Sequence, residues 1–167
     1  MIVVDKNLWH DSCFWGWFSR FFIPVDRGSD KLQISVIRQI KTALETGKGV
    51  LIFLEGGRTC RAKEGEKLQQ SAKGKKMRFL HSTAEGIARI TGAPVIPLWI
   101  QGTDDMLPNS EDPKVYLTKL LPWKRIQVVV GEPLFYQKLK AEGKLGSSGM
   151  FTQILSAELL ALADEIP

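Results

Sequence analysis

The chain has 167 residues, of which 44% are hydrophobic, and it carries a formal net charge of +5 at pH 7. This length and composition allow one buried core, so we expect a single domain over residues 1–167 and exclude an intrinsically disordered protein. The basic excess favours an acidic partner, such as a phosphate-bearing small molecule, an anionic membrane surface or a nucleic acid. Two cysteines, far apart and without metal-ligand spacing, argue against a disulfide framework and a zinc site.

The first half of the chain predicts a helix, a strand and a long loop. Asp30 is a suitable N-cap for a helix, and apolar side chains recur at helical spacing between residues 36 and 44. Residues 50–54 (VLIFL) are short, rich in β-formers and bounded by turn residues, which predicts a fully buried strand. Residues 56–78 are rich in Gly, Lys and Arg without a clear period, so we expect a long loop, and such loops are usually functional.

Two further helices are expected in the second half of the chain. Ser82 or Thr83 caps the first, which carries apolar residues at helical spacing and ends near Gly92. Ser147 or Ser148 caps the second, whose apolar residues fall on one face up to the C-terminal region.

Two more apolar runs predict strands. Residues 93–100 (APVIPLWI) form the first, interrupted by Pro97, and residues 125–130 (RIQVVV) form the second. Strands that alternate with helices predict an α/β domain with a mostly parallel central sheet flanked by helices. In such sheets ligands gather beyond the carboxyl ends of the strands, so residues that follow a strand are candidates for a site.

The stretch FLEGGRT, residues 53–59, lies at such a strand end. The pair Gly56-Gly57 lets backbone N–H groups approach an anion closely, because no Cβ intervenes. Arg58 adds a two-pronged donor suited to phosphate, and Glu55 is placed to orient it or to bond a substrate hydroxyl. Thr59 completes the stretch. A plain turn with a surface ion pair is the alternative explanation of these residues.

A second apolar run, FIPVDRG at residues 22–28, ends in the same way. Its Arg27 follows the run as Arg58 follows the other. Two arginines at two strand ends form a phosphate clamp, whereas a single arginine usually forms a salt bridge. The basic stretch over residues 57–78 also allows nucleic-acid binding, but we disfavour it, because the stretch lacks interleaved aromatic residues and no recognition motif is present.

Four stretches in order resemble the blocks of one family, the glycerolipid acyltransferases, which include 1-acylglycerol-3-phosphate acyltransferase. FIPVDRG (22–28) is similar to the second block, FLEGGRT (53–59) to the third, GAPVIPLWI (92–100) to the fourth, and VVVGEPL (128–134) to the segment that follows. The resemblance implies a glycerol-3-phosphate acyltransferase-like α/β fold. It also implies that the second and third blocks bind the glycerol-phosphate part of the acceptor. The predicted substrate-binding residues are therefore Arg27, Glu55, Gly56, Gly57, Arg58 and Thr59.

The first block of the family, His-x4-Asp, is not found. There its histidine acts as general base on the acceptor hydroxyl and its aspartate orients the ring. His10 is followed directly by Asp11, but Trp15 stands where the spacing requires an aspartate, and His81 comes after the third block. We interpret both histidines as ordinary ones and assign no catalytic residue. The chain is thus expected to be truncated at its N-terminus relative to the family.

The resemblance implies transfer of a fatty acyl group from acyl-CoA or acyl-carrier protein to a hydroxyl of a lysophospholipid or glycerol phosphate, in phospholipid biosynthesis. It implies no cofactor and no metal. The alternative is a non-catalytic phosphate or lipid-headgroup binding module, which the missing first block favours. Residues 8–22 are rich in Trp and Phe, which fits either a membrane interface or a helix packed on the sheet. Because the family works at membranes, we expect a peripheral protein at the cytoplasmic face.

Overall fold

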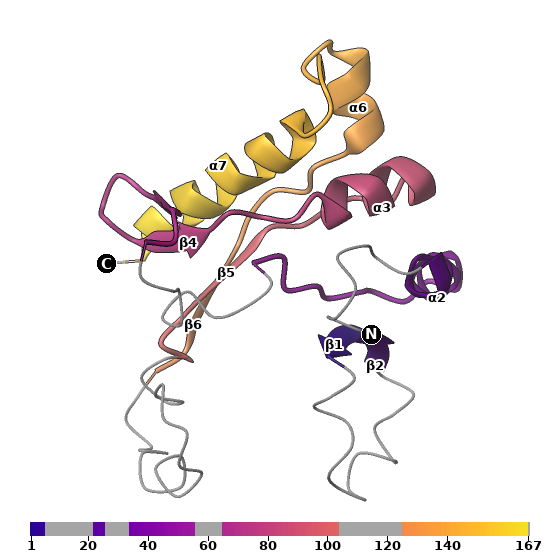
Figure 1. Ribbon diagram of the computed structural model, residues 1–167, viewed down its shortest axis with the longest axis horizontal. Coiled ribbons are helices and arrows are strands. Elements are labelled where there is room, and N and C mark those ends of the chain that lie inside the picture. Colours follow the sequence, from indigo (N-terminus) through magenta and orange to yellow (C-terminus); the bar gives the residue numbers. More distant parts are fainter. Residues whose placement is uncertain (6–21, 26–33, 56–64, 104–124, 167) are drawn as a thin grey trace, which may run out of the picture.

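The computed structural model describes residues 1–5, 22–25, 34–55, 65–103 and 125–166, and these form an α/β fold (Figure 1). The described helices are α2 (Ile34–Glu45), α3 (Thr83–Thr91), α6 (Tyr136–Ala141) and α7 (Met150–Glu165). The described strands are β1 (Ile2–Asp5), β2 (Phe22–Val25), β3 (Leu68–Gln70), β4 (Lys76–Arg78), β5 (Leu98–Gln101) and β6 (Gln127–Val130). The strands pair as β1–β2, β3–β4 and β5–β6.

The N-terminal part is built around β1. Strand β2 pairs with β1 in parallel. On the other side of β1, the Val3 amide donates to the Leu51 carbonyl at 3.0 Å and the Leu51 amide donates to the Met1 carbonyl at 2.8 Å. The segment at Leu51 therefore also runs parallel to β1, although the strand predicted over residues 50–54 is reduced to this single bridge.

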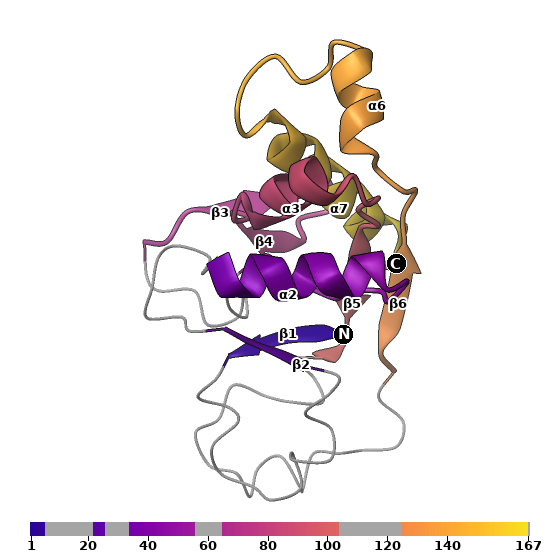
Figure 2. The same cartoon turned by 90° about the vertical axis from the view of Figure 1, so that its right-hand side faces the viewer.

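Helix α2 connects β2 to the Leu51 segment, as the helix of a β–α–β unit does. It packs against β2 and lies alongside both strands in Figure 2. Its apolar face buries Val36 and Ile40 against Ile23 of β2, and Ile87 of α3 joins the same cluster. The predicted helix over residues 36–44 is thus confirmed, while Asp30, its expected cap, lies outside the described residues.

The C-terminal half packs helices on the β5–β6 pair. These strands are antiparallel, with Leu98 opposite Val130, and a further antiparallel bridge joins Val95 to Leu134. Helix α7 contacts both strands and lies above them in Figure 1. Its Leu155 packs in a buried cluster with Met77 of β4.

The expected mostly parallel central sheet is not confirmed. Among the described residues only β1–β2 is a parallel pair, and β3–β4 and β5–β6 are antiparallel. The apolar run over residues 125–130 resembled a strand buried on both faces, as parallel sheets require. In the structure Val128 is 53% and Val130 62% exposed, so only one face of this pair is covered.

The predicted long loop over residues 56–78 is wrong for its second half. Strands β3 and β4 form an antiparallel hairpin, with Leu68 opposite Arg78. Gly74 lies in its turn with φ of 82°, a conformation that favours glycine. Sequence alternation did not reveal this hairpin because its strands are three residues long and only Met77 in them is buried.

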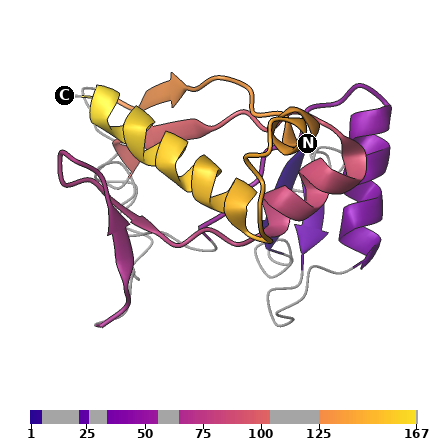
Figure 3. The ribbon, with the colours of Figure 1, turned by 90° about the horizontal axis from the view of Figure 1, so that it is seen from above.

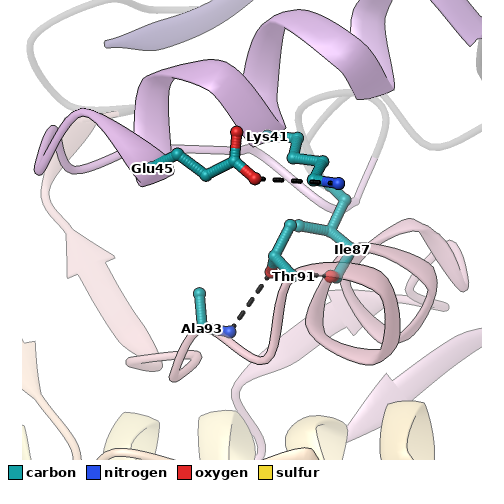
Figure 4. A network of polar contacts seen from close by, with 5 residues as sticks. All are labelled: Lys41, Glu45, Ile87, Thr91 and Ala93. Atoms are coloured by element: carbon teal, nitrogen blue, oxygen red, sulfur yellow. Dashed lines mark hydrogen bonds and ion pairs between the residues drawn. The ribbon is translucent and has the colours of Figure 1, made fainter.

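Helix α3 has the predicted limits: Ser82 stands at its N-cap position, although its side chain makes no capping hydrogen bond, and Gly92 ends the helix in the left-handed conformation, with φ of 68°. Figure 4 shows this end of α3 and the neighbouring α2, on which Lys41 and Glu45 form a separate ion pair of 3.6 Å. The Thr91 hydroxyl donates to the Ile87 carbonyl at 2.8 Å, and the Ala93 amide donates to the same hydroxyl at 3.2 Å. These bonds turn the chain out of α3 towards β5.

Helix α7 begins at Met150 with Gly149 as N-cap, so the prediction of Ser147 or Ser148 as its cap is wrong. Gly149 has no side chain to cap the helix. Instead Glu85 of α3, which is only 9% exposed, supplies the acceptors. Its Oε1 accepts from the Gly149 amide at 3.1 Å, and its Oε2 accepts from the Thr152 amide at 3.3 Å and from the Thr152 hydroxyl at 3.1 Å. One carboxylate from a neighbouring helix thus replaces a local capping box.

Two further findings concern the helices. Helix α6 was not predicted, and none of its residues is buried. Within the described part of the chain, no helix has the length and apolar character that crossing a membrane requires.

Candidate functional site

Glu55 is the one predicted site residue that the structure describes. Arg27, Gly56, Gly57, Arg58 and Thr59 lie outside the described residues, and so does the pair His10-Asp11. The arginine clamp therefore stays a prediction. The aromatic stretch over residues 8–21 is likewise outside the description.

Glu55 ends the described segment that passes beside β1, and it is held against the last residue of β4. Its Oε2 accepts a hydrogen bond from the Arg78 amide at 3.1 Å. One residue earlier, the Leu54 carbonyl accepts from the His81 amide at 3.2 Å. These two bonds fix the strand end that carries Glu55 next to the end of β4.

An open cleft of about 330 Å³ lies at this junction. Its described lining contains two carboxylates, two cations, one imidazole and one phenyl ring. These belong to Glu55, Glu66, Lys67, Arg78, Phe79 and His81. Groups of both signs therefore face one small space, in which a polar ligand meets donors and acceptors together.

Arg78 is one of the two cations in the described lining of this cleft. It is the last residue of β4, and its guanidinium Nη2 lies 3.0 Å from Glu66 Oε2. The Arg78 side chain is 18% exposed and that of Glu66 is 33% exposed. Such a half-buried ion pair is less screened by solvent than one on an open surface. Arg78 thus holds one carboxylate through its backbone and another through its side chain.

The far end of the β3–β4 hairpin is anchored to α7 by Asp164. Its Oδ1 accepts from the Ser71 hydroxyl at 2.6 Å and from the Lys73 amide at 3.1 Å, and its Oδ2 accepts from the Ala72 amide at 3.0 Å. The Ser71 hydroxyl is the main cause that lowers the pKa of Asp164, and the two amides add to it against partial desolvation. The hairpin is also tied to β5, because Lys75 Nζ donates to Gln101 Oε1 at 2.8 Å.

His81 is an exposed side chain of the cleft and directly precedes Ser82, the N-cap of α3. Sequence motifs did not assign it a place near Glu55, because it comes after the third block. Glu66 and Arg78 were also missed, since the stretch that contains them was interpreted as a loop. Their only sequence signal was the apolar Met77 between two basic residues, a pattern of one buried side chain in a short strand.

Among the described residues, no group of three or more His, Cys, Asp or Glu side chains is arranged to hold a metal ion.

Comparison with known proteins gives one family and one fold. A sequence model of the family described as Acyltransferase matches residues 1–101, a range that includes every residue named in the cleft. The crystal structure of the 1-acyl-sn-glycerophosphate (LPA) acyltransferase PlsC from Thermotoga maritima is similar in fold, with a TM-score of 0.61 and 15% sequence identity. The similarity covers 98% of this chain and 56% of that protein, so the chain spans just over half its length. Comparison with curated protein sequences gave no significant match.

Proposed function

The chain belongs to the acyltransferase family, and on this basis we propose that it transfers a fatty acyl group from a thioester donor to a hydroxyl of a phosphate-bearing glycerolipid. The donor is acyl-CoA or acyl-carrier protein, and the acceptor is a lysophospholipid or glycerol phosphate in phospholipid biosynthesis. The observation that carries this proposal is the place of Glu55. It belongs to the stretch that resembles the family's third block, and it lines a cleft together with Arg78.

In the proposed reaction the acceptor hydroxyl attacks the thioester carbonyl, the C–S bond breaks, and the thiolate leaves. The carboxylate of Glu55 accepts a hydrogen bond from a glycerol hydroxyl, while the cationic side chains of the cleft neutralise the phosphate. The hydroxyl proton must pass to a base within hydrogen-bond reach. The sequence motifs assigned no base, and we now propose His81 for this role, because it is the imidazole among the described residues that lines the same cleft.

The second candidate is a phosphate or lipid-headgroup binding module without catalysis. It is favoured by the absence of a His-x4-Asp spacing from the sequence. The two candidates share the binding site and differ only in turnover.

The deciding experiment follows phosphatidate formation by mass spectrometry, with palmitoyl-CoA and lysophosphatidate as substrates. Product is read directly because the two cysteines of the chain would react with a thiol reagent. We expect acceptor-dependent product, and we expect Glu55→Gln to raise the KM for lysophosphatidate. Glu158→Gln, an exposed carboxylate on α7, serves as the matched control and leaves KM unchanged. If no product forms while lysophosphatidate still binds, the binding module replaces the enzyme.

We also propose that the protein works as a peripheral protein at the cytoplasmic face of a membrane. The support is the net charge of +5 together with apolar side chains that stay exposed along β6 and just before it, at Ile126, Val128 and Val130. An amphipathic surface with a basic excess binds anionic lipid. Flotation with vesicles that contain anionic lipid tests this. The proposal is supported if the protein floats with the vesicles and the double variant Val128→Ser/Val130→Ser floats less. A protein that stays in the dense fraction contradicts it.

A further inference from the structure

We propose that β6 is a self-association surface, through which two copies of this chain pair edge to edge and antiparallel into one continuous sheet. The partner is thus a second copy of the chain, and the contact consists mainly of backbone hydrogen bonds. The inference goes beyond the proposed function, because it depends neither on acyl transfer nor on membrane binding.

Strand β6 is an open edge in the part of the chain that the structure describes. It pairs there with β5 alone, and it lies at the rim of the molecule in Figure 2 and Figure 3. Val128 and Val130 are 53% and 62% exposed, and Ile126, just before the strand, is 49% exposed. Gln127, which alternates with them, is exposed as well. Because side chains of both faces reach solvent, a second strand has access to this edge.

Helix α7 lies on one face of this strand. A Cβ at Gly131 would lie 2.9 Å from Leu162 Cδ1 of α7, so the face of Gly131 is the one that the helix covers. Successive side chains of a strand point to opposite faces. Ile126, Val128 and Val130 therefore share the other face, which agrees with their exposure.

The backbone groups of the same three residues point to the open edge. The Gly131 amide donates to the Pro97 carbonyl at 2.9 Å, on the side of β5. In an antiparallel ladder, residues that bond the neighbouring strand alternate with residues whose N–H and C=O groups point away from it. The groups of Ile126, Val128 and Val130 hence point away from β5. Such unpaired groups are a template for another strand.

A two-fold axis that passes through Val128, perpendicular to the sheet, satisfies these groups in both copies. Val128 then lies opposite Val128 of the second copy, and Ile126 lies opposite Val130. Each such pair exchanges two backbone hydrogen bonds, and its side chains meet on the same face. An axis through Val129 instead would place Ile126 opposite Glu132, an aliphatic side chain against a carboxylate. The strand is therefore self-complementary in the first register.

The charges around β6 favour the antiparallel direction. Natural edge strands are usually protected by Lys, Pro or a bulge, yet Gln127–Val130 contains no Lys or Pro. The nearest charges that the structure describes are the exposed Arg125 before the strand and the exposed Glu132 after it. In the antiparallel pair the basic end of each copy meets the acidic end of the other, whereas parallel pairing would bring like charges together.

The pairing is compatible with the membrane contact proposed above. Because the two-fold axis is perpendicular to the sheet, Val128 and Val130 of both copies face the same side, away from α7. The pair thus presents this apolar surface twice, and its attachment to a vesicle gains from two simultaneous contacts.

The test is sedimentation velocity of the 167-residue chain over a concentration series, without lipid or substrate. We expect a reversible monomer–dimer equilibrium. Val128→Pro should weaken the dimer roughly 10- to 100-fold, because each copy loses one N–H donor to the other. Its fold should persist, since this N–H faces the open edge, where proline is accepted. Val128→Thr is the matched control: it keeps the N–H and the β-branched shape, so the dimer Kd should stay within about two-fold of wild type.

A charge exchange tests the register without a proline. Arg125→Glu and Glu132→Arg, each alone, should weaken the dimer roughly three- to ten-fold, because each brings like charges together at both ends of the contact. When the two variants are mixed, they should form a heterodimer as tight as the wild-type dimer, since opposite charges meet again. Circular dichroism checks that every variant folds, and if Val128→Pro does not, the charge exchange decides.

The inference is overturned if the wild-type chain stays monomeric over the whole series, or if Val128→Pro dimerises as tightly as Val128→Thr. It is also overturned if the mixed charge variants associate no better than each does alone. Sedimentation involves neither turnover nor lipid. A failure here therefore leaves the proposed function standing, and a chain that dimerises without forming phosphatidate refutes only the enzyme.

Discussion

The capping of α7 by Glu85 gives the sharpest test of how this fold is held together. Glu85→Ala removes the acceptor of three hydrogen bonds, from the Gly149 amide, the Thr152 amide and the Thr152 hydroxyl. Loss of an N-cap costs about 1 kcal/mol, and loss of a carboxylate near a helix N-terminus costs about 0.3–1 kcal/mol more. Hydrogen bonds to charged groups are worth about 1.5–3 kcal/mol, but these three share one carboxylate. We therefore expect a total loss of about 2–4 kcal/mol.

Urea unfolding followed by circular dichroism measures this loss as a lower midpoint at an unchanged m-value. Glu85→Gln should lose about half as much, because its amide keeps one acceptor oxygen and the Thr152 hydroxyl can accept from its NH₂ group. Glu158→Ala removes an exposed carboxylate from α7 itself and should change stability by less than about 0.5 kcal/mol. If Glu85→Ala loses no more than Glu158→Ala, the capping argument is wrong.

Three further predictions concern α7 and the elements around it. The Ser71 hydroxyl is the main cause that lowers the pKa of Asp164 in the folded protein. The stabilisation by this carboxylate is therefore present above its unfolded pKa and is lost as pH falls through the folded pKa. In thermal melts, the Tm of Asp164→Asn should be lower than that of wild type at pH 7 and equal to it in strong acid. A constant difference at all pH values would contradict this. A Cβ at Gly131 would lie 2.9 Å from Leu162 Cδ1, so Gly131→Ala should destabilise by about 1–3 kcal/mol. Gly86→Ala, in α3 and with no atom within 4 Å of the new Cβ, should instead stabilise by about 0.5–1 kcal/mol in the same urea assay.

What the sequence predicted well was set by local chemistry. The C-terminal limit of α3 follows from Gly92, whose left-handed conformation and amide bond to the Ala88 carbonyl act within a few positions, whereas Ser82 stands at the N-cap without a side-chain capping bond. The start of α7 was misplaced because its cap is a side chain 64 residues away, and no local pattern reports such a partner. Ser147 and Ser148 satisfied the local rule, yet the tertiary carboxylate decided the boundary.

The same distinction separates the parts of the site. Glu55 was predicted because it follows an apolar run and lies in a stretch that resembles a family block. Its neighbour Arg78 was not, because the hairpin register that brings Arg78 beside Glu66 depends on strands of three residues. The sequence also did not show whether the strand pairs are parallel or antiparallel, because a short apolar run is compatible with a strand covered on one face or on both faces.

Helix α7 links stability to the geometry of the cleft. Its 16 residues span about 24 Å. At its start it is tied to α3 by Glu85, and near its end Asp164 holds the hairpin turn (Figure 3). Between these ties, residues 78–82 pass from β4 to α3 and carry Arg78 and His81 into the cleft. Because both ends of this short connection are fixed to one rigid helix, a change that loosens either tie should displace the guanidinium relative to Glu55. Variants of α7 far from the cleft should therefore weaken phosphate binding before they unfold the chain.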